Sequence, residues 1–365
     1  MNHFTRLAAV SIALVTPTLG QASFDGLGFL PDQVAPWSEA HGVSADGRVI
    51  VGFARRPDQP HAYEPFVWTA FTGMLPLGTL DASETSSGRA SAVSGDGRTV
   101  TGTVDVGGSA QAMDWRRMVG MAPLGSLPLS IRSDSKAVSS DGSVVVGKSF
   151  FFGGSSYWHE ATAWRAGVIA RLGHHPGALR SEAMGVSDDG QVIVGFADRT
   201  YLEGQSAFRW TQAQGFEILG DLQGGWHWSQ ANDANHDGSI IVGHATSTFG
   251  TASFGVDHRA AIWTEGTGFV KLDELPSSGA SSALDVSSNG RFIAGWARRF
   301  GTTRPVIWRD RVPIDVIEFM EQQGMDLSDW SLSEATSISD DGRVVVGWGR
   351  RASSGTSEAW RAILP

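Results

Sequence analysis

The sequence repeats one short pattern seven times, and this repetition limits the possible folds more than any other feature. The first copy, "HGVSADGRVIVG" at residues 41–52, places an Asp-Gly turn before an apolar run typical of a β-strand. The other copies end at Gly102, Gly147, Gly195, Gly243, Gly295 and Gly347. Successive turn glycines lie 45 to 52 residues apart. Four-stranded propeller blades recur at about this period. Leucine-rich and helical repeats fit this period less well.

Each hairpin is followed by an apolar strand that ends at a tryptophan, and then by a strand with a leucine near its end. The seven tryptophans are Trp68, Trp115, Trp164, Trp210, Trp263, Trp308 and Trp360. The last strand reads "GMLPLGTL" from Gly73, and a weaker version, "RVPIDVI", follows Trp308. A four-stranded unit on its own would expose both apolar faces, so the units must stack around an axis. We expect the tryptophans to fill the gaps between adjacent sheets.

The two ends of the chain predict how the ring closes. After Trp360 only "RAILP" remains, so the seventh unit lacks a fourth strand, whereas residues 24–30, "FDGLGFL", match "MLPLGTL" at 74–80. Pairing the N-terminal strand with the C-terminal unit would remove two exposed sheet edges. We therefore predict an all-β, seven-bladed β-propeller with four-stranded blades, closed by one N-terminal strand joining three C-terminal strands. It would form a single domain over residues 23–365.

The first residues have the layout of a secretory signal peptide, predicted over residues 1–22. Arg6 precedes an apolar stretch, Leu7–Val15, and small residues follow up to a predicted cleavage after Ala22. No segment reaches the roughly 20 apolar residues of a membrane-spanning helix. We expect a secreted protein, extracellular or periplasmic, and a monomer. The chain has no cysteine, which excludes disulfides, and its net charge of -10 argues against a nucleic-acid partner.

Several strands resemble one known family. "SAFRW" at 206–210 is similar to the tripeptide-containing strand that names the bacterial extracellular HAF-repeat proteins, and "HEATAW" from His159 and "HRAAIW" from His258 are looser copies. The final segment, "GMDLSDW" onward, resembles the usual end of these repeat regions, in which a short helix comes before it. The resemblance covers essentially the whole predicted mature chain and implies a propeller and export, but no particular activity. Many relatives carry a sorting tail or an outer-membrane barrel after the repeats, and we expect neither here.

The repeated acidic residues are best explained as turn residues. They are Asp46, Asp96, Asp141, Asp189, Asp237 and Asp341, with Asn289 in the remaining copy. Asp-Gly and Asn-Gly pairs tolerate the backbone of a tight hairpin turn. One copy, "DANHDG" at 233–238, also matches the start of a calcium loop, but His244 stands where a bidentate glutamate is needed. We therefore predict no metal site and no cofactor.

The loops between second and third strands and between units vary most, and they should lie on one face. Arginine pairs follow the second strand in units one, six and seven: Arg55, Arg56, Arg298, Arg299, Arg350 and Arg351. Ring closure makes these units neighbours, so six guanidinium groups should gather in one sector and suit carboxylate or sulfate groups. The alternative is that they are solvated arginines paired with Glu39, Glu334 or Asp58.

Aromatic residues outside the repeated core pattern are a second feature of these loops. They are Trp226, His227 and Trp228 in one loop and Tyr157, Trp158 and His159 in another. All three tyrosines, Tyr63, Tyr157 and Tyr201, fall in the same class of loop. Such side chains suit a sugar ring or a protein partner. The alternative is that they pack locally over the blades.

Three functions fit this sequence. The first is a secreted, non-catalytic recognition module that binds an extracellular polymer, an anionic glycan in the first instance, on the variable-loop face. The second is a polysaccharide-degrading enzyme, a lyase or a glycoside hydrolase, for which Glu39, Glu182 and Glu334 are candidate carboxylates. The third is a structural surface or matrix protein. The sequence has no nucleophile elbow, phosphate loop or dinucleotide fingerprint.

Overall fold

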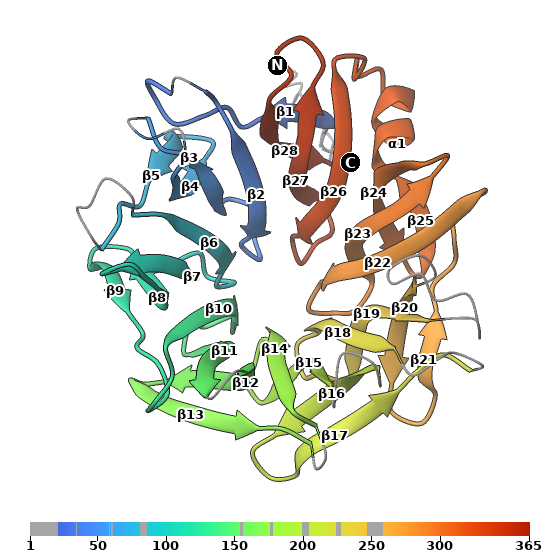
Figure 1. The fold of residues 1–365 in the computed structure, drawn as a ribbon. Coiled ribbons are helices and arrows are strands. Elements are labelled where there is room, and N and C mark those ends of the chain that lie inside the picture. Colours follow the sequence, from blue (N-terminus) through green and yellow to red (C-terminus); the bar gives the residue numbers. More distant parts are fainter. Residues whose placement is uncertain are drawn as a thin grey trace, which may run out of the picture.

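Seven four-stranded antiparallel sheets surround a central channel in the computed structural model (Figure 1). It describes residues 21–33, 35–57, 59, 61–80, 86–153, 156–175, 178–198, 204–223, 228–246 and 258–365. In six sheets the strand order follows the sequence from the innermost strand outward. The seventh sheet has the order β26, β27, β28, β1 from the centre outward, so the predicted seven-bladed propeller is confirmed.

The blades are numbered here in chain order. Blade 1 contains β2 (Ser38–Val43), β3 (Ile50–Arg55), β4 (Tyr63–Thr69) and β5 (Gly73–Pro76). Blade 2 contains β6 (Gly88–Val93), β7 (Thr99–Val106), β8 (Ser109–Arg116) and β9 (Gly120–Pro123). Blade 3 contains β10 (Arg132–Val138), β11 (Val144–Gly153), β12 (Ser156–Arg165) and β13 (Val168–Gly173). Blade 4 contains β14 (Arg180–Val186), β15 (Val192–Asp198), β16 (Gln205–Thr211) and β17 (Gly215–Gly220).

The remaining blades follow the same plan. Blade 5 contains β18 (Ser229–Ala234), β19 (Ile240–Thr246), β20 (His258–Thr264) and β21 (Gly268–Lys271). Blade 6 contains β22 (Ser278–Val286), β23 (Phe292–Arg299), β24 (Thr302–Arg309) and β25 (Val312–Asp315), followed by the helix α1 (Val316–Gln322). Blade 7 contains β26 (Trp330–Ile338), β27 (Val344–Arg351), β28 (Ser357–Ile363) and β1 (Ser23–Gly26). Among the described residues, no helix is long and apolar enough to cross a membrane.

The N-terminal strand closes the ring as predicted. Phe24 lies opposite Ala362 in the β1–β28 pairing. The chain continues beside β28, where the Leu27 N–H donates to the Ala359 carbonyl over 2.8 Å. Leu27 and Leu30 are buried in a cluster that also contains residues of blades 1 and 7. The predicted signal peptide lies largely outside the described residues, whose first buried side chain belongs to Ala22.

The repeated serine and aspartate residues hold the hairpin turns together. In the first turn, the Val49 N–H donates to Ser44 Oγ (3.0 Å), and Ser44 Oγ donates to Asp46 Oδ1 (2.7 Å). Asp46 Oδ1 also accepts from the Arg48 N–H (3.0 Å), and Gly47 adopts a φ of +72°. The other six turns repeat this arrangement, with Asn235 replacing serine and Asn289 replacing aspartate. The predicted turn role of these aspartates is therefore confirmed.

The repeated tryptophans form part of the core, as expected. The buried members are Trp68, Trp164, Trp263, Trp308 and Trp360. The other two are half-buried: Trp115 and Trp210. Large rings at one place in each unit fill the space between neighbouring sheets.

Every innermost strand contains a β-bulge, and the glycine that ends each apolar run makes room for it. In blade 4 the register shifts between Ala183 and Gly185. A Cβ added to Gly195 would lie 1.9 Å from the Glu182 carbonyl oxygen, and the other six glycines face the same obstruction. The repeat therefore keeps glycine here because backbone occupies the space of a side chain. The bulge also turns one extra residue per blade toward the channel.

Gly195→Ala should destabilise the protein by about 1–3 kcal/mol, because the new methyl group forces the inner strand away from its neighbour. Gly279→Ala is the matched control, since its Cβ would meet only the Arg298 carbonyl oxygen, at 3.7 Å. Denaturant unfolding of both variants measures the difference. Equal stability of the two variants would contradict the proposed steric role.

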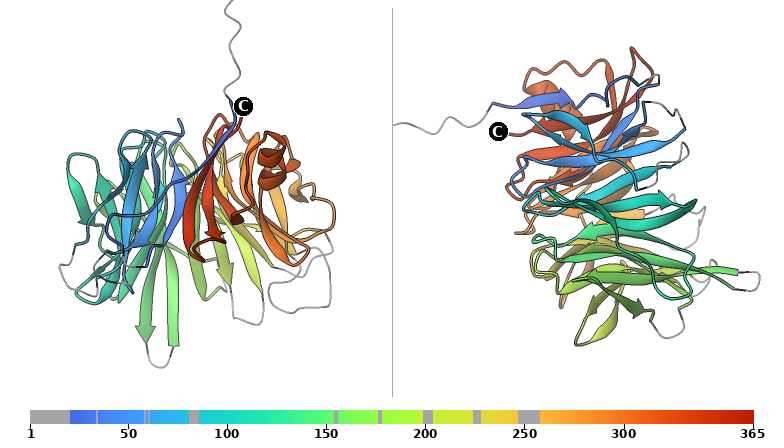
Figure 2. Two further views of the ribbon diagram at one scale, coloured as in Figure 1. Left: turned by 90° about the horizontal axis from the view of Figure 1, so that it is seen from above. Right: turned by 90° about the vertical axis from the view of Figure 1, so that its left-hand side faces the viewer.

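The two faces of the ring differ in their connections (Figure 2). The Asp-Gly turns and the turns between third and fourth strands form the turn face. The connections between second and third strands and between blades form the loop face. Both described chain ends lie at the turn face, since Ser23 pairs with Ile363. On the loop face, the hairpin of β11 and β12 extends beyond the other strands.

Candidate functional site

The loop-face end of the channel is bordered by residues that break the repeat. In each innermost strand, two positions flank one small residue, which is alanine in six blades and Ser135 in the other. The outer positions form the mouth ring: Glu39, Arg89, Asp134, Glu182, Gln230, Ser282 and Glu334. The inner positions are the bulge residues that line the channel and form the wall ring: His41, Ser91, Lys136, Met184, Asn232, Leu284 and Thr336. The small residue is kept for packing, whereas the flanking positions are free to carry function.

The second strands add one further residue per blade to this site. Each lies directly opposite a mouth-ring residue and directly follows the glycine that accommodates the bulge. These residues are Phe53, Thr103, Lys148, Phe196, His244, Trp296 and Trp348. Trp296 and Trp348 are half-buried, so each keeps an accessible ring surface.

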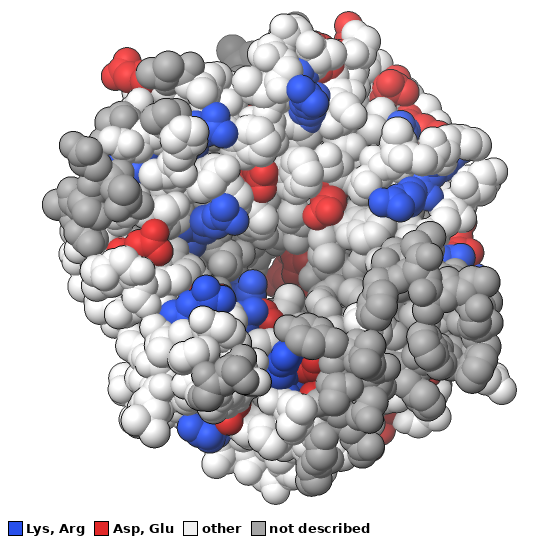
Figure 3. All heavy atoms as spheres, viewed as in Figure 1, with Lys and Arg blue, Asp and Glu red and all other residues white. Residues whose placement is uncertain are grey.

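Basic side chains gather on one side of the mouth (Figure 3). We call Arg89, Arg132, Lys136 and Lys148 of blades 2 and 3 the basic group. Arg89 is exposed and lies over the rings of Phe53 and Tyr63, 4.6 and 4.7 Å from their centroids. Arg132 is exposed and lies 3.8 Å from the ring centroid of Phe150. Neither has a carboxylate within ion-pair distance in the described part of the chain.

The two lysines of the basic group share one carboxylate. Glu182 Oε2 lies 2.7 Å from Lys148 Nζ, and Glu182 Oε1 lies 3.7 Å from Lys136 Nζ. The Glu182 side chain is only 7 % exposed, whereas that of Lys136 is 36 % exposed. One buried carboxylate therefore balances two ammonium groups, which leaves positive charge facing the mouth.

Acidic side chains border the mouth near β2 and β26, in blade 1, which adjoins the basic group, and in blade 7 beyond it (Figure 3). The Trp37 indole N–H donates to Glu39 Oε1 over 2.9 Å, and His41 Nε2 lies 3.5 Å from Glu39 Oε2. Burial raises the pKa of Glu334. The neighbouring Glu39 raises this pKa further, whereas His41 lowers it. Trp348 hydrogen-bonds to Glu334 and favours its charged form. Two carboxylates of adjacent blades are thus held in different environments.

A histidine pair completes the mouth at blades 5 and 6. The rings of His244 and His258 have centroids 4.6 Å apart, and the His258 ring lies edge-on to Trp296 at 5.6 Å. His244 Nδ1 lies 3.0 Å from Ser282 Oγ. Burial, assisted by His258, lowers the pKa of His244 to about 3. His244 is therefore neutral at physiological pH and presents a hydrogen-bonding edge without charge.

The arginine pairs lie on adjacent blades of the loop face, as expected, but several have local partners. Arg299 forms ion pairs with Glu318 and Asp315, and Arg351 forms them with Glu358 (2.8 Å) and Asp329 (3.3 Å). These are not the partners considered from the sequence, because Glu39 and Glu334 lie at the mouth and Asp58 lies outside the described residues. These ion pairs neutralise two of the six arginines that were expected to concentrate positive charge, Arg299 and Arg351.

The other arginines of this sector have different surroundings. Arg55 donates to the Ala35 carbonyl (3.2 Å), and Arg56 donates to the Ser86 carbonyl (3.1 Å). Arg298 and Arg350 are exposed. A ligand-binding role for this sector stays a prediction.

The predicted aromatic loop of blade 3 belongs to the projecting hairpin. Tyr157 is 63 % exposed and packs against the half-exposed Phe152, with ring centroids 4.6 Å apart. Trp158 stacks on Phe151, and His159 Nδ1 lies 3.0 Å from the Ser181 carbonyl oxygen. Burial lowers the pKa of His159. Tyr157 is thus available for contact above the basic group, whereas Trp158 and His159 pack within the fold.

The second predicted aromatic loop is only partly described. Trp226 and His227 lie outside the described residues, as does Tyr201. Trp228 is half-buried, its N–H donates to Asp221 Oδ2 (3.2 Å), and it forms a bridge with Gln205. The binding role proposed for this loop therefore remains a prediction.

The residues that resemble a calcium loop point to separate partners. Asp233 accepts from the Val286 N–H in the channel, Asn235 accepts from the Ile240 N–H, and Asp237 accepts from Ser239. His244 lies at the opposite end of β19, at the mouth. Within the described ranges, no group of three or more histidine or acidic side chains is arranged to hold a metal ion.

Calcium should accordingly leave the melting temperature unchanged, because the side chains of residues 233–238 are engaged in the turn and in the channel. Thermal melts with chelator and with millimolar calcium measure this directly. A calcium-dependent rise that Asp237→Ala abolishes would overturn the prediction.

Two carboxyl groups lie against each other inside the channel. Asp233 hydrogen-bonds to Asp285, and Asp285 Oδ2 accepts from Ser337 Oγ (2.6 Å) and from the Ile338 N–H (2.8 Å). Burial and the neighbouring charge of Asp285 raise the pKa of Asp233 well above its ordinary value. Burial also raises the pKa of Asp285. A hydrogen bond between two carboxyl groups needs a proton, so this pair holds one that the unfolded chain would release.

Asp233→Asn should stabilise the protein at alkaline pH and have little effect at acidic pH. A folded-state pKa above the unfolded value contributes stability at low pH, and this contribution is lost as pH rises through the folded-state pKa. Asparagine keeps the hydrogen bond without needing the proton. Melting temperatures from pH 4 to 9, with the exposed Asp273→Asn as control, measure the effect. Parallel curves for Asp233→Asn and the parent would contradict it.

Sequence patterns alone did not identify most of this site. The wall ring, Lys148, Trp296 and Trp348 were not singled out, although they differ among the seven copies at fixed positions. Comparing the residue after each repeated glycine, which reads Phe, Thr, Lys, Phe, His, Trp and Trp, would have revealed Lys148, Trp296 and Trp348.

Comparisons with known proteins support the architecture. No protein-family model matches the chain, and no curated protein sequence matches it. Oligogalacturonate lyase from Vibrio parahaemolyticus has a similar structure, with a TM-score of 0.56 and 10 % identity over 94 % of this chain and 97 % of that one. An oligogalacturonate lyase in complex with manganese gives a TM-score of 0.57 at 10 % identity, with the same coverage. TolB from Acinetobacter baumannii gives a TM-score of 0.48 at 14 % identity, over 74 % of this chain and 63 % of that one. At 10 % identity, the likeness to the two lyase structures establishes the fold alone.

Proposed function

We propose that this protein is an exported recognition module that binds an anionic saccharide at the channel mouth on the loop face. The observation that carries the proposal is the basic group, a local excess of positive charge on a chain with a net charge of -10. A ligand without negative charge would not need it. Export is the expectation from the N-terminal sequence.

The basic group has the chemistry to bind carboxylate or sulfate groups. Arg89 and Arg132 present guanidinium groups that are fixed over aromatic rings and accessible to solvent. A guanidinium group held in place loses less entropy when it forms paired hydrogen bonds to an anion. Lys136 and Lys148 add two ammonium groups whose charge Glu182 only half compensates.

The rest of the mouth fits the uncharged parts of a sugar. Trp296 and Trp348 offer half-buried rings for the apolar face of a pyranose, and Tyr157 offers a third above blade 3. The half-buried Gln230 and the neutral His244 supply hydrogen-bonding groups for hydroxyls. Two solved propellers of similar fold are named as lyases of oligogalacturonate, an acidic saccharide, which makes this ligand class the first to test.

A screen of the purified protein against neutral and acidic polysaccharides tests the proposal. Retention of acidic polymers that weakens with rising salt, without new reducing or unsaturated ends, is the expected result. Failure to retain any acidic polymer, or equal retention of neutral ones, would overturn it. The arginine pairs of blades 1, 6 and 7 are a second cationic surface on the same face, and the variants described in the Discussion separate the two.

One observation favours a second function, glycoside hydrolysis. Glu39 and Glu334 occupy the same position in adjacent blades, and burial raises the pKa of Glu334. Protonated Glu334 would donate its proton to the glycosidic oxygen as the C–O bond breaks, while Glu39 would take a proton from the attacking water. New reducing ends that disappear in Glu334→Gln, with binding retained, would establish this activity in place of the non-catalytic role.

A further inference from the structure

The channel below the mouth is a small polar cavity. Its volume is about 180 Å³, and residues from all seven innermost strands line it. Within the wall ring, the uncharged polar residues are Ser91, Asn232 and Thr336. Sites that enclose drug-sized ligands measure roughly 300–1,000 Å³. This cavity therefore has room for one sugar unit, but not for a saccharide chain folded back on itself.

A belt of hydrogen bonds joins the seven blades around the turn-face end of the channel. One hydrogen bond of 3.1 or 3.2 Å joins each pair of neighbouring blades, through residues next to the Asp-Gly turns. The donor and acceptor pairs are Ala45 and Gly95, Asp96 and Ser140, Ser140 and Asp188, Asp189 and His236, His236 and Ser288, Ser288 and Asp340, and Asp340 and Ala45.

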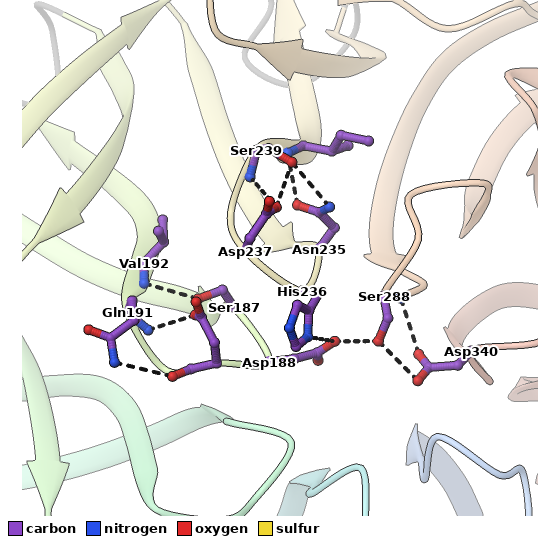
Figure 4. A network of polar contacts seen from close by, with 12 residues as sticks. Ser187, Asp188, Gln191, Val192, Asn235, His236, Asp237, Ser239, Ser288 and Asp340 are labelled. Atoms are coloured by element: carbon purple, nitrogen blue, oxygen red, sulfur yellow. Dashed lines mark hydrogen bonds and ion pairs between the residues drawn. The ribbon is translucent and has the colours of Figure 1, made fainter.

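Side chains from four blades also meet at this end (Figure 4). Ser288 Oγ of blade 6 hydrogen-bonds to Asp188 of blade 4 and to Asp340 of blade 7, the latter over 2.9 Å. His236 Nδ1 lies 3.6 Å from Asp188 Oδ2. Burial raises the pKa of Asp188. The hydrogen bond from Ser288 lowers this pKa, whereas the nearby Asp340 raises it. These contacts link side chains of blades 4, 5, 6 and 7 across the turn-face end of the channel.

We infer that the channel receives the terminal sugar of an anionic saccharide end-on, so that the protein recognises chain ends and not chain interiors. This inference rests on the proposed function. A polymer that crossed the mouth sideways would leave the cavity unused, and one that threaded the ring would have to open the belt.

The distribution of charge along the channel sets how far the chain enters. Lys136 and Lys148 lie near the mouth, whereas Asp233, Asp285, Asp188 and Asp340 lie deeper. A sugar carboxylate is attracted to the lysines and repelled by the deeper carboxyl groups. The terminal unit therefore places its carboxylate at the lysines and its hydroxyls against the wall ring, and the rest of the chain leaves over the loop face.

Isothermal titration with polygalacturonate fractions of defined length tests this inference. We expect one protein bound per chain at every length, with an affinity per chain that stops rising after the first few sugar units. Stoichiometry that increases with chain length would overturn end-on binding and leave the proposed function intact. Absence of binding to every fraction, and to alginate fractions as a second acidic probe, would remove both.

Variants that fill the channel provide an independent measurement. Ser91→Phe projects a ring into the cavity from blade 2, and Leu284→Trp does so from blade 6. Both should weaken binding of short fractions at least tenfold with an unchanged melting temperature, whereas the exposed Ser353→Phe should not. If a channel variant fails to fold, the other carries the test. Full affinity in either folded variant would show that the ligand stays outside the channel.

Discussion

Removing residues 23–31 is expected to lower the melting temperature by roughly 10 °C. The deletion uncovers the outer edge of β28 and removes Leu27 and Leu30 from the cluster between blades 1 and 7. A fully buried leucine contributes about 1.5–3 kcal/mol. For a protein of this size, each kcal/mol shifts the melting temperature by about 1–2 °C, and other contacts are lost with the two leucines.

Several contacts are lost together in this deletion. Phe24 packs against Trp360 and Trp330, with ring centroids 5.9 and 5.3 Å apart. Asp25 pairs with Arg361 over 2.6 Å, and the Gly28 N–H donates to Glu358 Oε1. The exposed edge should also promote association between chains.

Thermal melts of chains beginning at Gln21 and at Asp32 measure the effect. A synthetic peptide of residues 21–32 added to the shorter chain should restore part of the loss, which separates edge pairing from a general effect of truncation. Equal melting temperatures would show that the ring is held closed without the N-terminal strand.

The architecture could be predicted because each of its determinants is local and occurs seven times. The Ser-x-Asp-Gly turn specifies a hairpin from four residues, since Ser44 and Asp46 hydrogen-bond within that turn. The extra strand at the start of the chain and the missing fourth strand of the last unit then specify how the ring closes. Neither step needs knowledge of contacts between blades.

The site could not be predicted in the same way, because it is made of contacts between repeats. Lys148 and Glu182 belong to different units and meet only after the blades stack. The bulge decides that Lys136 lines the channel, and it follows from a register shift that leaves only a glycine as its sequence signal.

The arginine sector shows the same limit. Glu318 lies in α1 and Asp329 in the segment before β26, so the sequence placed neither beside an arginine pair. The number of positive residues in the sector was apparent from the sequence, whereas their compensation depended on the path of the connection between blades 6 and 7. Charge counts along a chain do not reveal net charge on a surface.

The double variant Arg89→Gln and Arg132→Gln should weaken binding of an acidic saccharide about tenfold or more. Each replaced guanidinium group removes a charge-assisted contact, and about 1.4 kcal/mol in total corresponds to a factor of ten. The fold should be unaffected, because both arginine side chains are exposed and the rings beneath them stay packed within the blades. Lys148 is a less suitable target, since its loss would leave the buried Glu182 poorly compensated.

The double variant Arg298→Gln and Arg350→Gln is the matched control. It removes the same charge from two exposed arginines of the same face, on blades 6 and 7. Titration calorimetry at low and high salt should show a large loss for the first pair, a small loss for the control, and convergence of both toward the parent as salt screens the charges. A neutral saccharide should bind the parent and both double variants with the same affinity.

The comparison of the two pairs decides where the ligand binds. If the control pair weakens binding as much as the Arg89 and Arg132 pair, long-range attraction to the whole loop face explains the affinity and the mouth is not a defined site. If only the control pair weakens it, the ligand occupies the arginine sector of blades 6, 7 and 1. In that case the paired Arg299 and Arg351 must exchange their carboxylate partners for the ligand, and the affinity should rise when Glu318 or Asp329 is replaced by its amide. A loss confined to the Arg89 and Arg132 pair places the anion beside Lys136 and Lys148, at the entrance to the channel.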